Sequence, residues 1–93
     1  MPTYIMISTL TAEGVQTVKN NPNRIKEVNR ELEQIGARVT AQWATLGRFD
    51  FVNVVEAPDV ETIARASLSI AARGSVRIET LPALDIDQFL RNF

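Results

Sequence analysis

The chain contains neither cysteine nor histidine. The first absence excludes disulfides, thiol nucleophiles and thiolate metal sites, and the second removes the commonest general base and metal ligand. No spacing of acidic residues resembles a calcium-binding loop, and no glycine-rich run precedes a Lys-Ser or Lys-Thr pair as in a phosphate-binding loop. The residues therefore predict no metal site and no cofactor.

An excess of one charge is also lacking. Ten basic and eleven acidic residues give a formal net charge of −1, and the basic residues are scattered rather than gathered in the stripe that nucleic acid favours. No apolar run reaches the roughly 18 residues needed to span a bilayer. The start, Met1-Pro2-Thr3-Tyr4, has no basic signal-peptide region. We expect a soluble cytoplasmic protein that binds neither nucleic acid nor membrane.

What is present is an ordinary globular composition, with 45% hydrophobic and 23% charged residues. We expect residues 1–93 to form a single domain. A chain of this length buries a smaller share of its surface than a larger domain does, so association with further copies is a natural way to gain core.

Apolar spacing and capping residues predict four strands and two main helices. The predicted strands are residues 4–10, 37–45, 49–56 and 75–81; the helices are residues 22–35 and 58–73, with a short turn or helical piece at 11–14 and a short helix over 85–93. The order β-α-β-β-α-β is typical of ferredoxin-like folds. It predicts an α+β sandwich with one antiparallel sheet, ordered 4-1-3-2, and both helices on one face.

Gly47 and Arg48 are predicted to form the tight connection between the second and third strands, at the start of the corner Gly47-Arg48-Phe49-Asp50. Asp50 is the tempting catalytic residue of this corner. Aspartate also stabilises turns by accepting backbone hydrogen bonds, and this structural role is the expected one.

This corner is followed by Phe51-Val52-Asn53-Val54-Val55-Glu56-Ala57-Pro58-Asp59. Together with the first strand, Tyr4-Ile5-Met6-Ile7-Ser8, and with Thr80-Leu81-Pro82-Ala83, it resembles the GYD-domain family of small prokaryotic proteins over nearly the whole chain. The resemblance implies a ferredoxin-like fold of the dimeric α+β barrel type and no settled activity. Phe49 stands where the family's name leads us to expect tyrosine, so no phenolic hydroxyl can act there.

Alternation along the strands sorts their side chains into two faces. A β-branched set is predicted to lie under the helices: Ile5, Ile7, Val52, Val54, Val76 and Ile78. The opposite, semi-polar set comprises Tyr4, Met6, Ser8, Thr40, Gln42, Phe49, Phe51, Asn53, Val55, Arg77 and Glu79. Because this second set is too apolar for full solvation, we expect it to pack against a second subunit in a symmetric homodimer that partly encloses a cavity.

The semi-polar face supplies most of the candidate site residues. The candidate ligand-binding residues are Tyr4, Ser8, Gln42, Trp43, Asn53 and Arg77; the candidate dimer-interface residues are Met6, Phe51, Val55 and Glu79. Trp43 either walls the cavity or fills the core beside the first helix. The alternative for the polar members is a network that sets the register of the dimer.

The absence of a catalytic motif favours a homo-oligomeric small-molecule-binding or regulatory module, with copies of itself and an unidentified small molecule as partners. The alternative is a small cofactor-independent enzyme, such as a monooxygenase or isomerase, with its site between the sheet face and the dimer partner. Asn53, Trp43, Tyr4 and Arg77 would then bind and polarise an aromatic substrate. Whether the protein is an enzyme stays open at this point.

Overall fold

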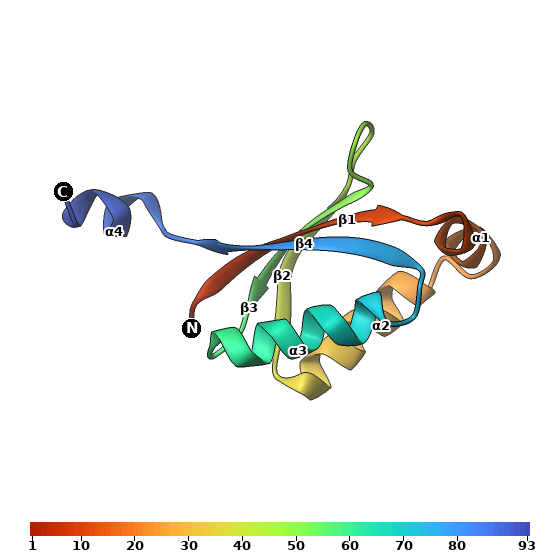
Figure 1. Ribbon diagram of the computed structural model, residues 1–93, viewed down its shortest axis with the longest axis horizontal. Coiled ribbons are helices and arrows are strands. Elements are labelled where there is room, and N and C mark those ends of the chain that lie inside the picture. Colours follow the sequence, from red (N-terminus) through yellow and green to blue (C-terminus); the bar gives the residue numbers. More distant parts are fainter.

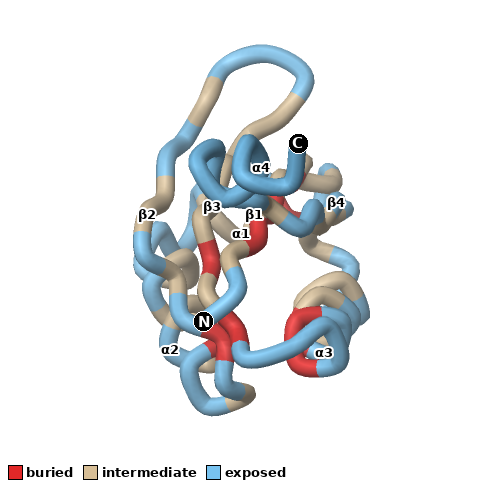
Figure 2. The backbone as a smooth tube through the Cα atoms, turned by 90° about the vertical axis from the view of Figure 1, so that its left-hand side faces the viewer, coloured by how far each residue is buried: buried red, intermediate tan, exposed pale blue.

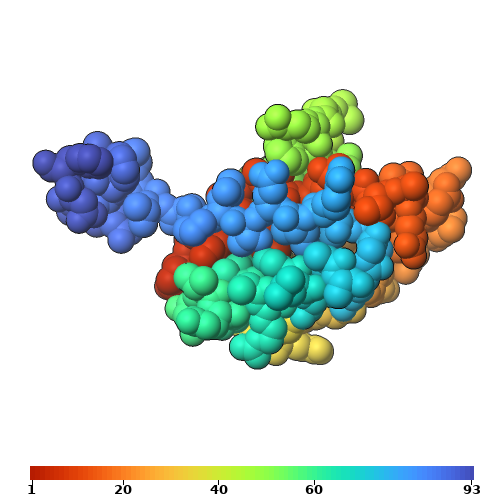
Figure 3. All heavy atoms as spheres, viewed as in Figure 1, coloured from red at the N-terminus to blue at the C-terminus, as the bar shows by residue number.

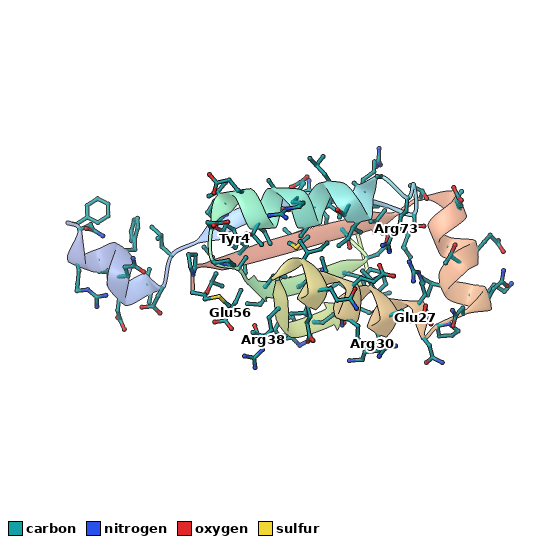
Figure 4. The ribbon with its side chains drawn as sticks, turned by 90° about the horizontal axis from the view of Figure 1, so that it is seen from below. Tyr4, Glu27, Arg30, Arg38, Glu56 and Arg73 are labelled. Atoms are coloured by element: carbon teal, nitrogen blue, oxygen red, sulfur yellow. The ribbon has the colours of Figure 1, made fainter.

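The computed structural model describes residues 1–93 as a four-stranded antiparallel sheet with helices packed on one side (Figure 1). The elements are β1 (Thr3–Leu10), α1 (Ala12–Asn20), α2 (Arg24–Ile35), β2 (Arg38–Ala44), β3 (Phe51–Glu56), α3 (Val60–Ala71), β4 (Val76–Ala83) and α4 (Ile86–Arg91). The strand order β2-β3-β1-β4 confirms the predicted topology. Helices α2 and α3 run side by side beneath the sheet, as a ferredoxin-like α+β fold requires (Figures 1 and 4).

The start of α3 and the end of α2 follow the expected capping chemistry, whereas α2 begins after Asn23 without a side-chain cap hydrogen bond. The Asp59 carboxylate accepts a hydrogen bond of 2.8 Å from the Thr62 amide at the start of α3. Gly36, with φ of 107°, ends α2, and Gly74, with φ of 78°, lies just beyond α3. Both glycines occupy the left-handed region, where a side chain is strained.

Helix α1 is longer than the predicted turn over residues 11–14, and it lies very close to the segment before β4. The Thr11 hydroxyl caps it, accepting a bond of 3.1 Å from the Gly14 amide. The Thr11 amide donates to the Ser75 carbonyl at 3.0 Å, and the Thr11 hydroxyl donates to the Gly74 carbonyl at 2.6 Å. A Cβ atom on Gly14 would lie 1.9 Å from the Ser75 carbonyl oxygen. The absent side chain at Gly14 therefore allows this approach.

The connection between β2 and β3 is a loop over residues 45–50, so the predicted tight turn at Gly47 was wrong, and β3 begins at Phe51. The Thr45 amide and hydroxyl close the loop by donating to the carbonyls of Asp50 and Phe49 at 2.8 and 2.7 Å. The Asp50 carboxylate accepts a bond of 2.7 Å from the Leu10 amide. Asp50 does accept a backbone hydrogen bond, as expected, but it joins the loop to the end of β1.

The two faces of the sheet are reversed with respect to the prediction for β1 and β3. The buried core combines Tyr4, Met6 and Val55 of the sheet with helix residues such as Leu32 and Ile63. Figure 2 shows buried segments on the strands and on α3. The β-branched residues Ile5, Ile7, Val52 and Val54 lie on the opposite face, which we call the outer face; the face under the helices is the inner face.

The physical reason for the reversal is that both faces are apolar. Alternation separates two sets of side chains, but it does not say which set meets the helices. Here the longer Tyr4 and Met6 fill the space between the sheet and the helices. On β4 the prediction holds, because Val76 and Ile78 lie on the inner face.

Candidate functional site

A cavity of about 140 Å³ lies between the inner face of the sheet and helices α1, α2 and α3. Its walls are mainly apolar and come from every layer: Met6, Phe51 and Val55 from the sheet, Val18 from α1, Val28 from α2 and Ile70 from α3. An apolar cavity with a few polar groups is the usual form of a small-molecule site. This cavity is therefore a candidate functional site.

A ladder of side-chain amides crosses one wall of the cavity. Asn29 of α2 donates to the Gln42 carbonyl oxygen at 2.9 Å, and Gln42 Nε2 donates to Asn53 Oδ1 at 2.8 Å. Asn53 Nδ2 then donates to the Met6 carbonyl at 3.0 Å. The ladder satisfies polar groups that would otherwise be costly beneath the helices, and it ties α2 to three strands.

Ser8 adds a polar group that the chain leaves free. Ser8 is only 8% exposed and lines the cavity. The neighbouring amides are engaged with one another, and none of the side-chain hydrogen bonds engages the Ser8 hydroxyl. This hydroxyl is thus available to a bound molecule.

A charged cluster lies at the end of the cavity next to α1 (Figure 4). Arg24 Nη1 contacts Glu27 at 3.2 Å and Glu31 at 3.1 Å, while Arg73 Nη2 pairs with the other Glu31 oxygen. Burial raises the pKa of Glu31, but the hydrogen bonds from Arg73 and Arg24 outweigh it and leave this pKa below its ordinary value. Hydrogen bonding to Glu27, followed by Glu31, raises the pKa of Arg24.

The predicted ligand-binding residues do not form one group. Ser8, Gln42 and Asn53 line the cavity, and Tyr4 lies in the core between the sheet and helices. Trp43 pairs with Val52 on the outer face, where it is 55% exposed, so it neither walls this cavity nor fills the core. Arg77 pairs with Thr9 and is also on the outer face. The four residues considered for an enzyme are thus divided between opposite sides of the sheet.

Three of the predicted interface residues also need correction. Met6, Phe51 and Val55 line the cavity beneath the helices, because the faces of β1 and β3 are reversed. Their position removes them from any surface that a second subunit could cover. Glu79 is exposed on the outer face and stays a candidate interface residue.

Sequence reasoning missed the contribution of the helices to the site. Asn29, Arg24 and Arg73 all line the cavity. Asn29 carried a usable signal, since it lies four residues after Ile25 and therefore on the apolar stripe of α2. A polar amide on a buried stripe requires a partner. The arginines carried no comparable signal.

The outer face is a second apolar surface, and it is open. Its central residues are Ile5, Ile7, Val52 and Val54, with Trp43 and Leu81 toward the two edges of the sheet. Four charged residues lie on this face by strand register: Arg77 and Glu79 of β4, Glu56 of β3 and Arg38 of β2. Arg77 and Glu79 line a shallow concavity beside the 45–50 loop with Arg48 and Phe49. Arg48 lies over the Phe49 ring, 5.0 Å from its centroid.

Residues 84–93, here called the arm, project from the end of β4 away from the body of the domain (Figures 1 and 3). Asp85 caps α4 by accepting from the Asp87 amide at 3.1 Å. The arm exposes five large hydrophobic side chains: Leu84, Ile86, Phe89, Leu90 and Phe93. The rings of Phe89 and Phe93 meet edge to face with centroids 4.7 Å apart. The arm is thus a compact apolar segment whose side chains are mostly not covered by the rest of the chain.

No three acidic side chains gather closely enough to hold a metal ion. None of the helices combines the length and the apolar character needed to cross a membrane.

Comparison with known proteins places this arrangement in a family. The sequence matches the GYD domain over residues 4–92. It is 59% identical, over 87 residues, to a Thermus thermophilus protein named "glutamine synthetase and cystathionine beta-lyase binding protein", and the match covers 92% of each chain. The chain belongs to the GYD domain family.

Proposed function

We propose that this protein is a homo-oligomeric binding module that attaches to metabolic enzymes and regulates them. The observation that carries the proposal is the identity of 59%, over 92% of both chains, with a protein named for binding glutamine synthetase and cystathionine beta-lyase. The geometry supports a binding role through two large uncovered apolar surfaces, the outer face and the arm. Such surfaces are characteristic of interfaces.

The accessible area of the chain supports association with a second copy. A compact monomer of 10.4 kDa is expected to expose about 5,400 Å², whereas this chain exposes 6294 Å². The excess, about 900 Å², matches the roughly 800 Å² that each partner contributes to a standard protein–protein interface. A single chain thus leaves about one interface uncovered.

The outer face is suited to a second copy of this chain. Its apolar centre is flanked on β4 by a positive and a negative residue, Arg77 and Glu79. In a two-fold arrangement the same patch is used twice, so Arg77 of one protomer can meet Glu79 of the other. The arm continues directly from β4, the strand that carries both charges, and can extend the same interface. The proposed dimer uses the face of the sheet away from the helices, as the sequence prediction does, but with the β-branched residues of β1 and β3 in place of Met6, Phe51 and Val55.

The oligomer is tested with a charge at the centre of the outer face. Val54→Arg should convert the protein to a monomer, measured by light scattering at micromolar concentration. The matched control is Leu68→Arg, which changes an exposed apolar residue on the solvent side of α3 and should leave the oligomer intact. A monomeric wild-type protein, or dissociation by the control alone, would contradict the arrangement.

Enzyme binding is tested with purified glutamine synthetase and cystathionine beta-lyase from the same organism. Calorimetric titration should give saturable binding to at least one of them, accompanied by a change in its kcat or KM. An unrelated enzyme of similar net charge serves as the control. If neither enzyme binds while light scattering shows an intact oligomer, the proposed partners are wrong.

A further inference from the structure

We propose that the cavity between the inner face and helices α1, α2 and α3 binds a compact apolar carboxylate, such as a small aromatic or branched acid. The site lies on the side of the sheet opposite to the outer face. It is therefore independent of the proposed oligomer and of enzyme binding, and it can be tested without either.

The size and walls of the cavity determine the body of the ligand. Its volume of about 140 Å³ is close to that of an engineered apolar cavity of about 150 Å³ that binds benzene. The walls from Phe51, Val28 and Ile70 offer only apolar contacts. One six-membered ring or a branched chain of similar bulk fits this space, whereas a sugar or a nucleoside would leave several hydroxyl groups unpaired.

Two polar groups on the sheet can orient the ligand. Ser8 is 8% exposed as a residue, lines the cavity and makes no side-chain hydrogen bond. Asn53 Nδ2 carries two hydrogens, of which the Met6 carbonyl takes one. An acceptor oxygen on the ligand would satisfy both groups.

The carboxylate of the ligand is inferred from the N–H donors of Arg24 and Arg73, because Glu27 and Glu31 already balance the two positive charges. Both arginines line the cavity, whereas their partners Glu27 and Glu31 do not. Arg24 uses only Nη1 for its two carboxylates, and Arg73 uses Nη2. Each guanidinium therefore keeps further N–H donors in the planar geometry that suits a carboxylate. An inorganic phosphate could use these donors but would gain nothing from the apolar walls.

The test is a titration of the isotopically labelled protein, followed by NMR, with three probes: benzoate, benzamide and inorganic phosphate. Benzoate should bind saturably and shift amides around the cavity, including those of Ser8, Val28 and Ile70. Its affinity should exceed that of benzamide by at least tenfold, which corresponds to about 1.4 kcal/mol. Phosphate should cause no saturable shift of the same amides. Absence of saturable benzoate binding, equal affinity for benzamide, or shifts confined to the outer face would overturn the proposal.

Variants separate the cavity from a general attraction of anions. Val28→Phe fills the cavity and should abolish benzoate binding, with the NMR spectrum showing that the fold is kept. Arg73→Gln changes a partly exposed side chain and should weaken binding at least tenfold. Arg30→Gln, a change on α2 away from the cavity (Figure 4), should alter the affinity less than twofold. If Val28→Phe does not fold, the comparison of Arg73→Gln with Arg30→Gln decides, and equal affinities in the two variants would refute the site.

Discussion

Replacing Gly14 by alanine tests how tightly α1 is held against the rest of the domain. Helix propensity alone predicts that alanine stabilises α1 by about 0.5–1 kcal/mol. The structure predicts the opposite sign. The new Cβ would lie 1.9 Å from the Ser75 carbonyl oxygen and 3.1 Å from Leu10 Cδ2, so α1 would have to move away. That movement would stretch the bond of 3.0 Å from the Thr11 amide to the Ser75 carbonyl.

The expected size of the effect can be worked out from these contacts. Overpacking costs about 1–3 kcal/mol, and weakening one backbone hydrogen bond adds about 0.5–1.5 kcal/mol. After the gain in propensity, Gly14→Ala should lower the free energy of unfolding by about 0.5–4 kcal/mol.

The assay for Gly14→Ala is denaturation by urea at fixed protein concentration, because association makes the apparent stability depend on concentration. Gln16→Ala, an exposed change on the same helix, should stay within about 0.5 kcal/mol of the wild type. If the Gly14→Ala protein is as stable as the wild type, or more stable, then α1 does not lie as close to the Ser75 carbonyl as described.

The remaining predictions concern polar residues. Asn53→Leu should lower the free energy of unfolding by about 1–3 kcal/mol, because the Met6 carbonyl and Gln42 each lose a hydrogen-bond partner. Urea denaturation measures this change, and an unchanged midpoint would contradict the prediction. Asp50→Ala should cost about 1.5–3 kcal/mol through loss of the bond of 2.7 Å to the end of β1, with faster amide exchange there; unchanged exchange would exclude this anchor. Acid should also destabilise the fold, because the pKa of Glu31 is lower in the folded state than its ordinary value of 4.5. The stability that ionised Glu31 contributes is fully present above pH 4.5 and is lost as the pH falls through the lowered pKa. Glu31→Gln should therefore flatten the stability profile below about pH 4.5, and a profile identical to that of the wild type would refute the role of its ion pairs.

The secondary structure was largely predictable because its signals are local. The cap Asp59 and the stop glycines Gly36 and Gly74 marked helix ends within a few residues. The strand order followed from short connections and the usual handedness of such folds. The length of α1 was missed because its start depends on a distant contact, from Thr11 to the Ser75 carbonyl.

The candidate site was predicted only in part, because it depends on which face of the sheet the helices cover. Ser8, Gln42 and Asn53 lie on one face of the sheet, because strand parity and register determine their side. The assignment of that group to the surface was wrong. Arg73 approaches Glu31 only through the packing of α3 against α2, and no local pattern in either helix indicates that contact.

Because both faces of the sheet are apolar, hydrophobic burial alone does not select the register in which the strands pair. A slip of one residue usually moves the core set of a strand into water and is costly. In this sheet a slip of β3 against β1 would bring Val52 and Val54 beneath the helices, where they would also be well buried. The slip would instead break two polar interactions: the bond from Asn53 to the Met6 carbonyl and the bond that Asp50 accepts from the end of β1. These two side chains therefore help to distinguish the native pairing from slipped alternatives, and so contribute to the uniqueness of the fold as well as to its stability.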